Sequence, residues 1–345
     1  MAVHSYVFGF QSLAARKTFD ANLVKEGVLE KIAILFMASL VASFAFISRV
    51  NASPVAYASG TGGGGACTVS APCAFADALS LVDGGGLVKC LDAGPYVYTG
   101  VGFSRSMTID CPGVIRITFP NFGAFWLSGT SSQVVRIRNA IFDGGSGGWP
   151  AIRVIGSPTV FLENCVFQNH NAGNAIAIEF KPNAPGAQLI MTDTVVDNNG
   201  IMPSTGGGLQ VFPAPGGGAG VILNRVRFGF NVTAIVSSSG NGGIGVSMKD
   251  SQVISSRSNG ILVQAGTTIN FVIDQSSLTN NVGNALQSSG ANSHVYIGNS
   301  TIFGNDVGVS AEAGTVQSFK NNQIFGNGSD GTPLPAVPGA TGGLQ

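Results

Sequence analysis

Residues 276–286 read SSLTNNVGNAL, and residues 300–309 read STIFGNDVGV. Both stretches run through a short apolar segment, an Asn-containing turn, and a small residue followed by an aliphatic one. Similar units occur from about residue 140 onward. Recurrence at a period of about 20–50 residues is the sequence signature of a repeat architecture, so these stretches carry the most information about the fold.

Three columns of residues recur in register along the chain. The first column is apolar and ends a short strand-like segment: Phe142, Phe167, Val196, Phe228, Ile254, Leu278, Phe303 and Phe325. The second lies two positions later and is rich in Asn: Gly144, Asn169, Asn198, Phe230, Ser256, Asn280, Asn305 and Asn327. The third pairs a small residue with an aliphatic one: Ala151-Ile152, Ala175-Ile176, Gly208-Leu209, Ala234-Ile235, Gly260-Ile261, Ala285-Leu286 and Gly308-Val309.

Each unit has room for two or three short strands separated by Gly, Asn and Ser turns, but not for a crossover helix. Units stacked at ~4.8 Å would bring like residues into ladders and close a shared core, which predicts an all-β parallel solenoid of about ten coils. Asn suits the turns because it tolerates the left-handed conformation, and stacked amides can hydrogen-bond between coils. The alternation around Val135 and Ile137 is one position out of step with Met248 and Val272, so the register of the first coils stays open.

The composition excludes several other classes of protein. The chain has 345 residues, 50 Gly, 44% hydrophobic and 10% charged residues, and zero formal net charge. Without basic blocks it lacks the electrostatic footprint of nucleic-acid binding. Its many Gly residues disfavour a helical fold, and its apolar content disfavours a disordered chain.

The N-terminal region has the features of an export signal. Residues 32–47 form an uncharged apolar run that follows Lys31 and precedes small residues near Ala52 and Ala58. This order is typical of a secretory signal peptide; the alternative is an uncleaved anchor helix, although the run is shorter than the ~20 residues that span a bilayer. We therefore expect an exported protein, secreted, at the cell surface or in the periplasm, with no membrane span after cleavage.

This reading divides the chain into four parts. We expect residues 1–58 to be removed, residues 59–86 to form an N-terminal cap, residues 87–328 to form the solenoid and residues 329–345 to be a disordered tail. An open solenoid end exposes core and needs a cap. A short helix over residues 74–83 would supply one, because Phe75, Ala78, Leu79 and Val82 share one of its faces.

Several segments also resemble a known group of proteins. They are residues 66–73 (ACTVSAPC), 75–79 (FADAL), 88–96 (VKCLDAGPY) and 106–111 (SMTIDC). They look like exported bacterial right-handed parallel β-helix proteins with the pectate-lyase-like fold, a subfamily of unassigned function. The resemblance covers about residues 60–328 and implies the fold, but it implies almost nothing about activity, because this fold carries many functions.

The five cysteines fit an oxidising compartment better than a metal site. The spacings of Cys67, Cys73, Cys90 and Cys111 are not those of a zinc site, and no metal is expected. Stacked coils would place Cys90 beside Cys111, and we pair Cys67 with Cys73; reduced thiols are the alternative. Cys165 is expected in a strand, as a buried free thiol.

No cofactor is predicted. The glycine patterns at residues 60–65 and 240–245 match a dinucleotide motif, but neither follows a strand and opens a helix. The nucleophile-elbow pattern at residues 144–148 lies in a loop of the expected solenoid rather than on a strand-to-helix turn.

One constellation of polar residues stands out as a candidate site. In the repeat register Asp143, Gln168 and Asp197 share a column, so the two carboxylates would stand two coils or ~9.6 Å apart, with His170 nearby. This separation is near the upper end of that used by inverting glycosidases. The alternative is that these are solvated turn residues.

Two further pairs of residues have open roles. Arg138 and Glu163 fall in one column of adjacent coils, where we expect an ion pair. Trp126 and Trp149 are either core residues or platforms for sugar stacking.

Acidic residues are scarce, and the motifs of the carbohydrate-active members of this fold are missing. We therefore expect a secreted or periplasmic β-helix scaffold that binds polysaccharide and has no evident catalytic site. The alternative is a polysaccharide lyase or glycoside hydrolase that acts through Asp143, His170 and Asp197. The oligomeric state is left open.

Overall fold

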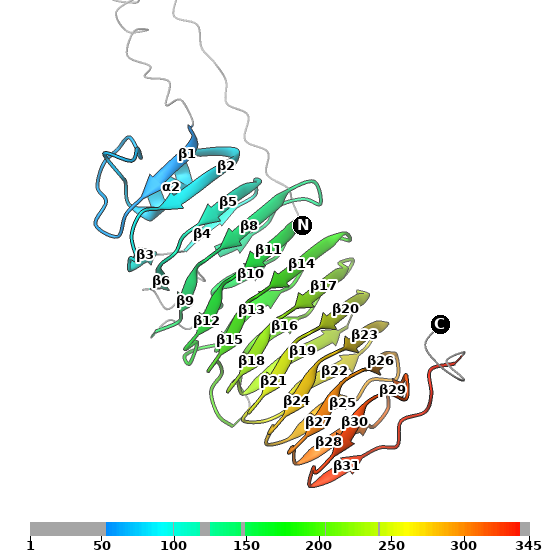
Figure 1. Cartoon of the computed structure of the whole chain (residues 1–345). Coiled ribbons are helices and arrows are strands. Elements are labelled where there is room, and N and C mark those ends of the chain that lie inside the picture. The colour runs from blue at the N-terminus through cyan, green and yellow to red at the C-terminus, as the bar shows by residue number, and fades with distance from the viewer. Residues whose placement is uncertain are drawn as a thin grey trace, which may run out of the picture. The chain divides into compact units, whose positions relative to one another are not determined.

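The computed structural model describes residues 53–98, 100–117, 125–145, 149–203, 205–240 and 242–338. The chain winds through three parallel sheets, here called A, B and C, and visits them in this order in each coil (Figure 1). Sheet A contains β1 (Ser53–Ala58), β2 (Val82–Cys90), β5 (Met107–Asp110), β8 (Val134–Arg138), β11 (Thr159–Glu163), β14 (Ala187–Thr192), β17 (Ala219–Asn224), β20 (Ile244–Lys249), β23 (Ile269–Asp274), β26 (Ser293–Gly298) and β29 (Thr315–Ser318). Sheet B contains β3 (Tyr96–Tyr98), β6 (Val114–Ile117), β9 (Ile141–Asp143), β12 (Val166–Gln168), β15 (Val195–Asp197), β18 (Arg227–Gly229), β21 (Gln252–Ile254), β24 (Ser277–Thr279), β27 (Thr301–Phe303) and β30 (Gln323–Phe325). Sheet C contains β4 (Val101–Phe103), β7 (Phe125–Leu127), β10 (Ile152–Val154), β13 (Ile176–Phe180), β16 (Gly207–Val211), β19 (Thr233–Ser239), β22 (Ile261–Ala265), β25 (Asn284–Ser288), β28 (Val307–Ala311) and β31 (Ser329–Gly331).

The strands from β2 to β31 form ten successive sets of three, about nine turns of solenoid from the first set to the last. Neighbouring strands within each sheet come from successive coils and run parallel. Each strand is therefore completed only by the coils before and after it, as the short repeat requires. The structure confirms the all-β parallel solenoid.

Inward-facing side chains form apolar ladders along each sheet. In sheet B, Phe142, Phe167, Val196, Phe228 and Leu278 are fully buried and lie in register, as expected. For the other three coils the predicted position is wrong by one residue. The inward-facing residues are Val253, Ile302 and Ile324, not Ile254, Phe303 and Phe325. Alternate residues of a strand face opposite sides, so Phe303 and Phe325 point outward, 42% and 51% exposed.

The predicted Asn column merges two adjacent columns of the turn between sheets B and C. In one, left-handed residues lie outside: Asn169, Asn198, Phe230, Ser255 and Asn280. In the next, the side chains point into the core and are buried: His170, Asn199, Asn231, Ser256, Asn281 and Asn305. The Oδ1 of Asn281 accepts the backbone N–H of Ser256 at 3.0 Å, and the Oδ1 of Asn305 accepts that of Asn281 at 2.9 Å. Stacked amides therefore link the coils, as predicted.

A second ladder, built of hydroxyl groups, fills the turn between sheets A and B. The Oγ atoms of Ser251, Ser276 and Ser300 each accept a backbone N–H from the preceding coil at 3.0–3.1 Å. Cys165 lies in an earlier coil of this turn and is 1% exposed. The prediction that it is a buried free thiol is confirmed, and its placement in a strand is wrong. Burial raises the pKa of this thiol to about 12.

The register of sheet A resolves the question left open for the first coils. Ile137 and Met248 belong to one inward-facing ladder, in which every intervening strand contributes one residue. Val272 pairs with Ser247 in the neighbouring outward column and is 38% exposed. Inside and outside are therefore the same in the first and last coils.

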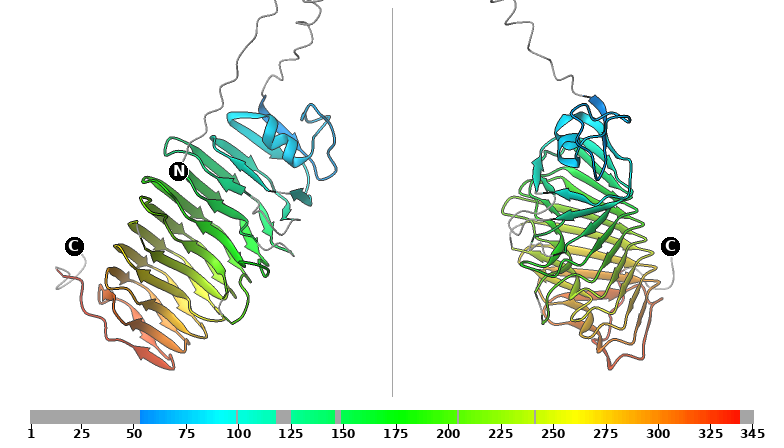
Figure 2. Two further views of the ribbon diagram at one scale, coloured as in Figure 1. Left: turned by 180° about the vertical axis from the view of Figure 1, so that it is seen from behind. Right: turned by 90° about the vertical axis from the view of Figure 1, so that its left-hand side faces the viewer.

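The N-terminal end of the core is covered by the helix α2 (Phe75–Leu81), visible in Figure 2. Phe75, Ala78 and Leu79 are buried, and the Phe75 ring lies 5.5 Å from that of Tyr96 in the first coil. Strand β1 pairs with β2, and Ala56 and Ala58 are completely buried. Removal of residues 1–58 would take away β1, and the position of cleavage stays a prediction. The apolar run at residues 32–47 lies outside the described residues.

The C-terminal segment is ordered further than expected. Strand β31 pairs with β28, Ala336 forms a parallel bridge with Ser318, and Leu334 packs against the core. The prediction that residues 329–345 form a disordered tail is therefore wrong for residues 329–338. Residues 339–345 lie outside the described part of the chain.

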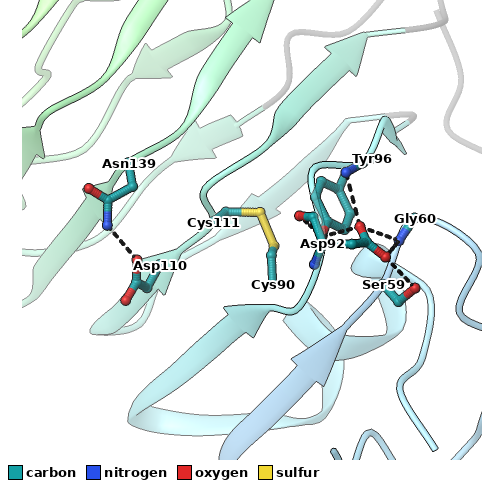
Figure 3. The surroundings of a disulfide bond; sticks show 9 residues. Ser59, Gly60, Cys90, Asp92, Tyr96, Asp110, Cys111 and Asn139 are labelled. Carbon is teal, nitrogen blue, oxygen red and sulfur yellow. Dashed lines mark hydrogen bonds between the residues drawn. A yellow bond between two sulfur atoms is a disulfide. The ribbon is translucent and has the colours of Figure 1, made fainter.

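Both predicted disulfides are present. Cys67 pairs with Cys73, with Cα atoms 4.7 Å apart. Cys90 pairs with Cys111, with Cα atoms 4.6 Å apart (Figure 3). The second disulfide joins adjacent coils. Two disulfides are typical of a protein that matures in an oxidising, extracytoplasmic compartment. Within the described ranges, no helix is both long and apolar enough to cross a membrane.

Asp92 ties the N-terminal loop to the first coil (Figure 3). Its carboxylate accepts hydrogen bonds from the Ser59 hydroxyl at 2.6 Å, the Tyr96 hydroxyl at 2.7 Å and the Gly94 N–H at 2.9 Å. These bonds, that of Ser59 foremost, favour the ionised form and lower the pKa of Asp92 to about 2.

This shift predicts a pH dependence of stability. The pKa of Asp92 is lower in the folded chain than its ordinary value of 3.8. Its contribution to the free energy of unfolding is therefore complete above about pH 4 and is lost as the pH falls toward 2. The side chain is exposed, so we expect an effect of about 1 kcal/mol or less. In urea unfolding, the free energy of unfolding of Asp92→Asn should fall less from pH 6 to pH 3 than that of wild type. Asp306→Asn, at an exposed position near the other end, should behave as wild type; equal pH dependence in all three proteins would contradict the prediction.

Candidate functional site

The predicted acidic column exists on the outer face of sheet B. Gln168 pairs with Asp143 on one side and Asp197 on the other, so the carboxylates stand two coils apart. Asp143 Oδ1 accepts the Gly145 N–H at 3.2 Å, and Asp197 lies 3.4 Å from Arg227 Nη1. The two carboxylates share a face, but each has a local partner.

His170 does not reach that face. Its side chain is completely buried, and its backbone N–H donates to Asn199 Oδ1 at 3.0 Å, at the start of the asparagine ladder. Burial lowers the pKa of His170 to about 4, because the charged form is disfavoured away from water. The expectation that His170 contacts a ligand beside Asp143 and Asp197 is therefore corrected: the ring belongs to the core side of the turn.

The ion pairing around Arg138 also differs from the prediction. Arg138 and Glu163 are register neighbours, as expected. Arg138, however, pairs with Asp110 in the preceding coil at 3.1 Å, and Glu163 pairs with Arg136. The carboxylate of Glu163 therefore reaches Arg136, two residues along β8, instead of its direct neighbour.

The outer face of sheet C carries a more distinctive set of side chains. The strand register places one outward residue from each of eight successive coils in a single column: Trp126, Arg153, Glu179, Gln210, Val236, Leu262, Gln287 and Ser310. We call this set the sheet C column. It starts with an aromatic and a charged part and continues into an amide and aliphatic part.

The first part of the column is a compact cluster around one guanidinium. Arg153 Nε donates to Glu179 Oε2. The Arg153 guanidinium lies 5.3 Å from the Trp126 ring and 4.9 Å from the Trp149 ring, and the two rings are 6.4 Å apart. The side chains of Arg153 and Glu179 are only 16% and 10% exposed. The ion pair and the cation–π contacts therefore fix the orientation of two half-buried tryptophans at the surface.

The second part of the column runs along a groove of about 260 Å³ on the same sheet. Its lining mixes small, polar and aliphatic residues: Ile176, Gly206, Gly207, Leu209, Gln210, Thr233, Val236, Ser258, Asn259 and Leu262. A Cβ at Gly206 would lie 2.2 Å from the Ala175 carbonyl oxygen, and one at Gly207 would lie 2.0 Å from that of Thr233. Both glycines have positive φ, so this wall of the groove has no side chains.

Amide groups continue beyond the groove. Asn259 Nδ2 donates to Gln287 Oε1 at 3.0 Å, and Gln287 Nε2 donates to Glu312 Oε1 at 2.6 Å. The face thus presents aromatic rings, hydroxyls and amides in a row. Within the described residues, no group of three or more His, Cys, Asp or Glu side chains could hold a metal ion.

One ambiguous repeat prevents the prediction of this face from the sequence. Ala175-Ile176 and Ala177-Ile178 both fit the pattern of a small residue followed by an aliphatic one, and Ile178 is the buried member, in register with Ile152 and Leu209. The next residue in the correct register is Glu179, beside Arg153 and Gln210. Choosing Ile176 instead put Ala177 in that place and concealed the ion pair.

Comparison with solved structures shows what the fold is similar to. A search of solved structures finds the crystal structure of pectate lyase Pel9A, with a TM-score of 0.56 and 16% sequence identity over 83% of this chain and 81% of that one. No model of a known protein family matches the chain. A search of curated proteins gives no match either. The chain is therefore a parallel β-helix with the pectate-lyase-like fold.

Proposed function

We propose that this parallel β-helix is an exported protein that binds a polysaccharide along the outer face of sheet C. The observation that carries the proposal is the continuity of the sheet C column, in which the Trp–Arg–Glu cluster leads directly into the groove beside Gln210. Binding sites of small and chain-like ligands combine apolar or aromatic surface with a few oriented polar groups, as this face does.

Two general features support the export and ligand parts of the proposal. The disulfides fit an extracytoplasmic protein, and residues 32–47 have the pattern of a signal peptide. A fold shared with a pectate lyase is compatible with a polysaccharide ligand. Because β1 begins at Ser53, we propose that the exported chain keeps this residue and starts at or before it.

The proposal predicts that blocking the groove abolishes polysaccharide binding. Val236 faces outward in the groove, so Val236→Trp would fill it in a strand that tolerates aromatic residues. The disulfide-bonded protein should be retained by at least one of a panel of insoluble polysaccharides, and the variant should lose at least tenfold in affinity. Ser247→Trp makes the same change on the outer face of sheet A and should bind as wild type. Equal retention of both variants, or no retention of wild type by any polysaccharide, would contradict the proposal.

Cleavage of a polysaccharide on the outer face of sheet B is a second candidate function, favoured by the register of Asp143 and Asp197 there. It must operate without His170, which is buried. Product analysis of the same polysaccharides with wild type and an Asp143→Asn, Asp197→Asn double variant tests it. Products that disappear in the double variant would establish a cleaving site; a folded wild type that yields no products would leave binding as the function.

A further inference from the structure

The charge of the sheet C face defines the class of ligand it fits. The sheet C strands from β7 to β25 contain two charged residues, Arg153 and Glu179. They neutralise each other through an ion pair that is mostly removed from water. A polyanionic chain gains its affinity from cations that are free to pair with it, and here the guanidinium already has its carboxylate.

The polar groups that line the groove are neutral. Gln210 and Thr233 line the groove and offer an amide and a hydroxyl, which can both donate and accept hydrogen bonds; the Asn259 amide beside them is held by Gln287 and Asn284. Sugar hydroxyls have the same dual capacity. The apolar contribution comes from Val236 and Leu262 and from the two tryptophans, whose flat rings match the C–H faces of a pyranose.

The direction of the site follows from the strand register. The sheet C column from Trp126 to Leu262 crosses six successive coils, β7, β10, β13, β16, β19 and β22. Adjacent coils are ~4.8 Å apart, a rise comparable to the length of one sugar unit in an extended chain. A straight polymer lying across the strands would therefore meet about one outward side chain per sugar.

We infer that this site takes a neutral, linear, β-linked hexose chain that crosses the coils of sheet C, with sugar faces against Trp126 and Trp149 and hydroxyls against the amides of the groove. The inference rests on the proposed function and specifies its ligand. An uncharged ligand is favoured over a uronate polymer because the sheet C strands from β7 to β25 carry one positive and one negative charge, already paired with each other.

The two tryptophans of the site are the only ones in the chain, so intrinsic tryptophan fluorescence reports directly on this cluster. The disulfide-bonded protein is titrated with cellohexaose and mannohexaose, and with hexagalacturonate as the anionic counterpart. Calorimetry gives the dissociation constants. We expect at least one neutral hexasaccharide to bind and change the emission, with at least tenfold weaker binding or none for hexagalacturonate.

Variants locate the binding. Trp149→Ala should weaken binding at least tenfold by calorimetry. Gln210→Ala removes the amide in the coil next to the ion pair and should weaken binding severalfold. Trp149→Phe keeps an aromatic ring and should retain part of the affinity, which guards against misfolding of the alanine variant. Tyr296→Ala removes a half-buried aromatic residue from the outer face of sheet A and should have no effect.

The outcomes separate the two claims. Binding of hexagalacturonate in preference to the neutral chains would overturn the ligand class and leave the proposed function standing. Binding that is unaffected by Trp149→Ala and Gln210→Ala would overturn the site. Absence of binding to all three hexasaccharides, together with the absence of retention by any insoluble polysaccharide, would overturn both.

Discussion

Replacement of Asn305 by Ala is expected to lower the free energy of unfolding by about 4 kcal/mol. The substitution removes hydrogen bonds from several buried partners at once, and each such loss costs about 1–3 kcal/mol. Asn305 is 3% exposed. Its Oδ1 accepts from both the backbone N–H and the Nδ2 of Asn281, and its Nδ2 donates to the Leu278 carbonyl at 3.0 Å and to Asn327 Oδ1 at 2.9 Å. The side chain thus joins three coils.

Equilibrium unfolding in urea measures this loss. Asn270→Ala is the matched control, because Asn270 is an exposed residue on the outer face of sheet A. We expect its free energy of unfolding to change by about 0.5 kcal/mol or less. Equal losses for the two variants would show that the asparagine ladder does not stabilise the solenoid.

Removal of Glu179 alone is expected to cost about 3 kcal/mol. Glu179→Leu leaves the Arg153 guanidinium mostly buried without its carboxylate, and an uncompensated buried charge is strongly destabilising. The double variant Arg153→Met, Glu179→Leu should recover most of the loss, because an apolar pair of similar size avoids the cost of removing charges from water.

Thermal or urea unfolding of the single and double variants forms the test. Arg225→Met is the control. It breaks the Arg225–Asp193 ion pair, in which both side chains are about half exposed, and should lower the stability far less than Glu179→Leu. A double variant that is as unstable as the single one would mean that the tryptophans depend on the ion pair for their packing. A double variant that regains its stability can be assayed for polysaccharide binding without the complication of misfolding.

The fold could be predicted from the sequence because a solenoid repeats its own contacts. Each coil meets the same environment, so Phe142, Phe167, Val196 and Phe228 lie in one ladder and mark the period directly. Cys90 and Cys111 fall one coil apart for the same reason. The predicted register is wrong where one residue type suits two adjacent positions, because a shift of one residue moves a side chain to the other face of the strand.

The turns show why the register was harder to predict than the period. Asn is favoured at the exposed left-handed position, as at Asn280, and also at the buried position that follows, as at Asn281. The first preference comes from the backbone and the second from hydrogen bonds between coils. The sequence pattern alone does not separate two causes that select the same residue.

The candidate site was less accessible to prediction than the fold. Asp143 and Asp197 could be aligned because they end the well-marked strands of sheet B. Predicting the partner of Arg153 requires the correct choice between Ile176 and Ile178 as the buried residue. The groove is open because Gly206 and Gly207 have no side chains, which a repeat pattern does not reveal. A surface site built from the outward residues of several coils can be predicted only when the register of every one of these coils is assigned correctly.

The two disulfides make the two ends of the solenoid differ in their resistance to local opening. Both crosslinks, together with α2, lie in the first part of the solenoid, up to Cys111, whereas the last coils are held by hydrogen bonds and packing. In a linear array each coil is stabilised mainly by its neighbours, so local opening is easiest where no crosslink constrains the coils. Breathing motions should therefore spread inward from β29, β30 and β31. We expect the groove, several coils away, to keep its geometry during such motions.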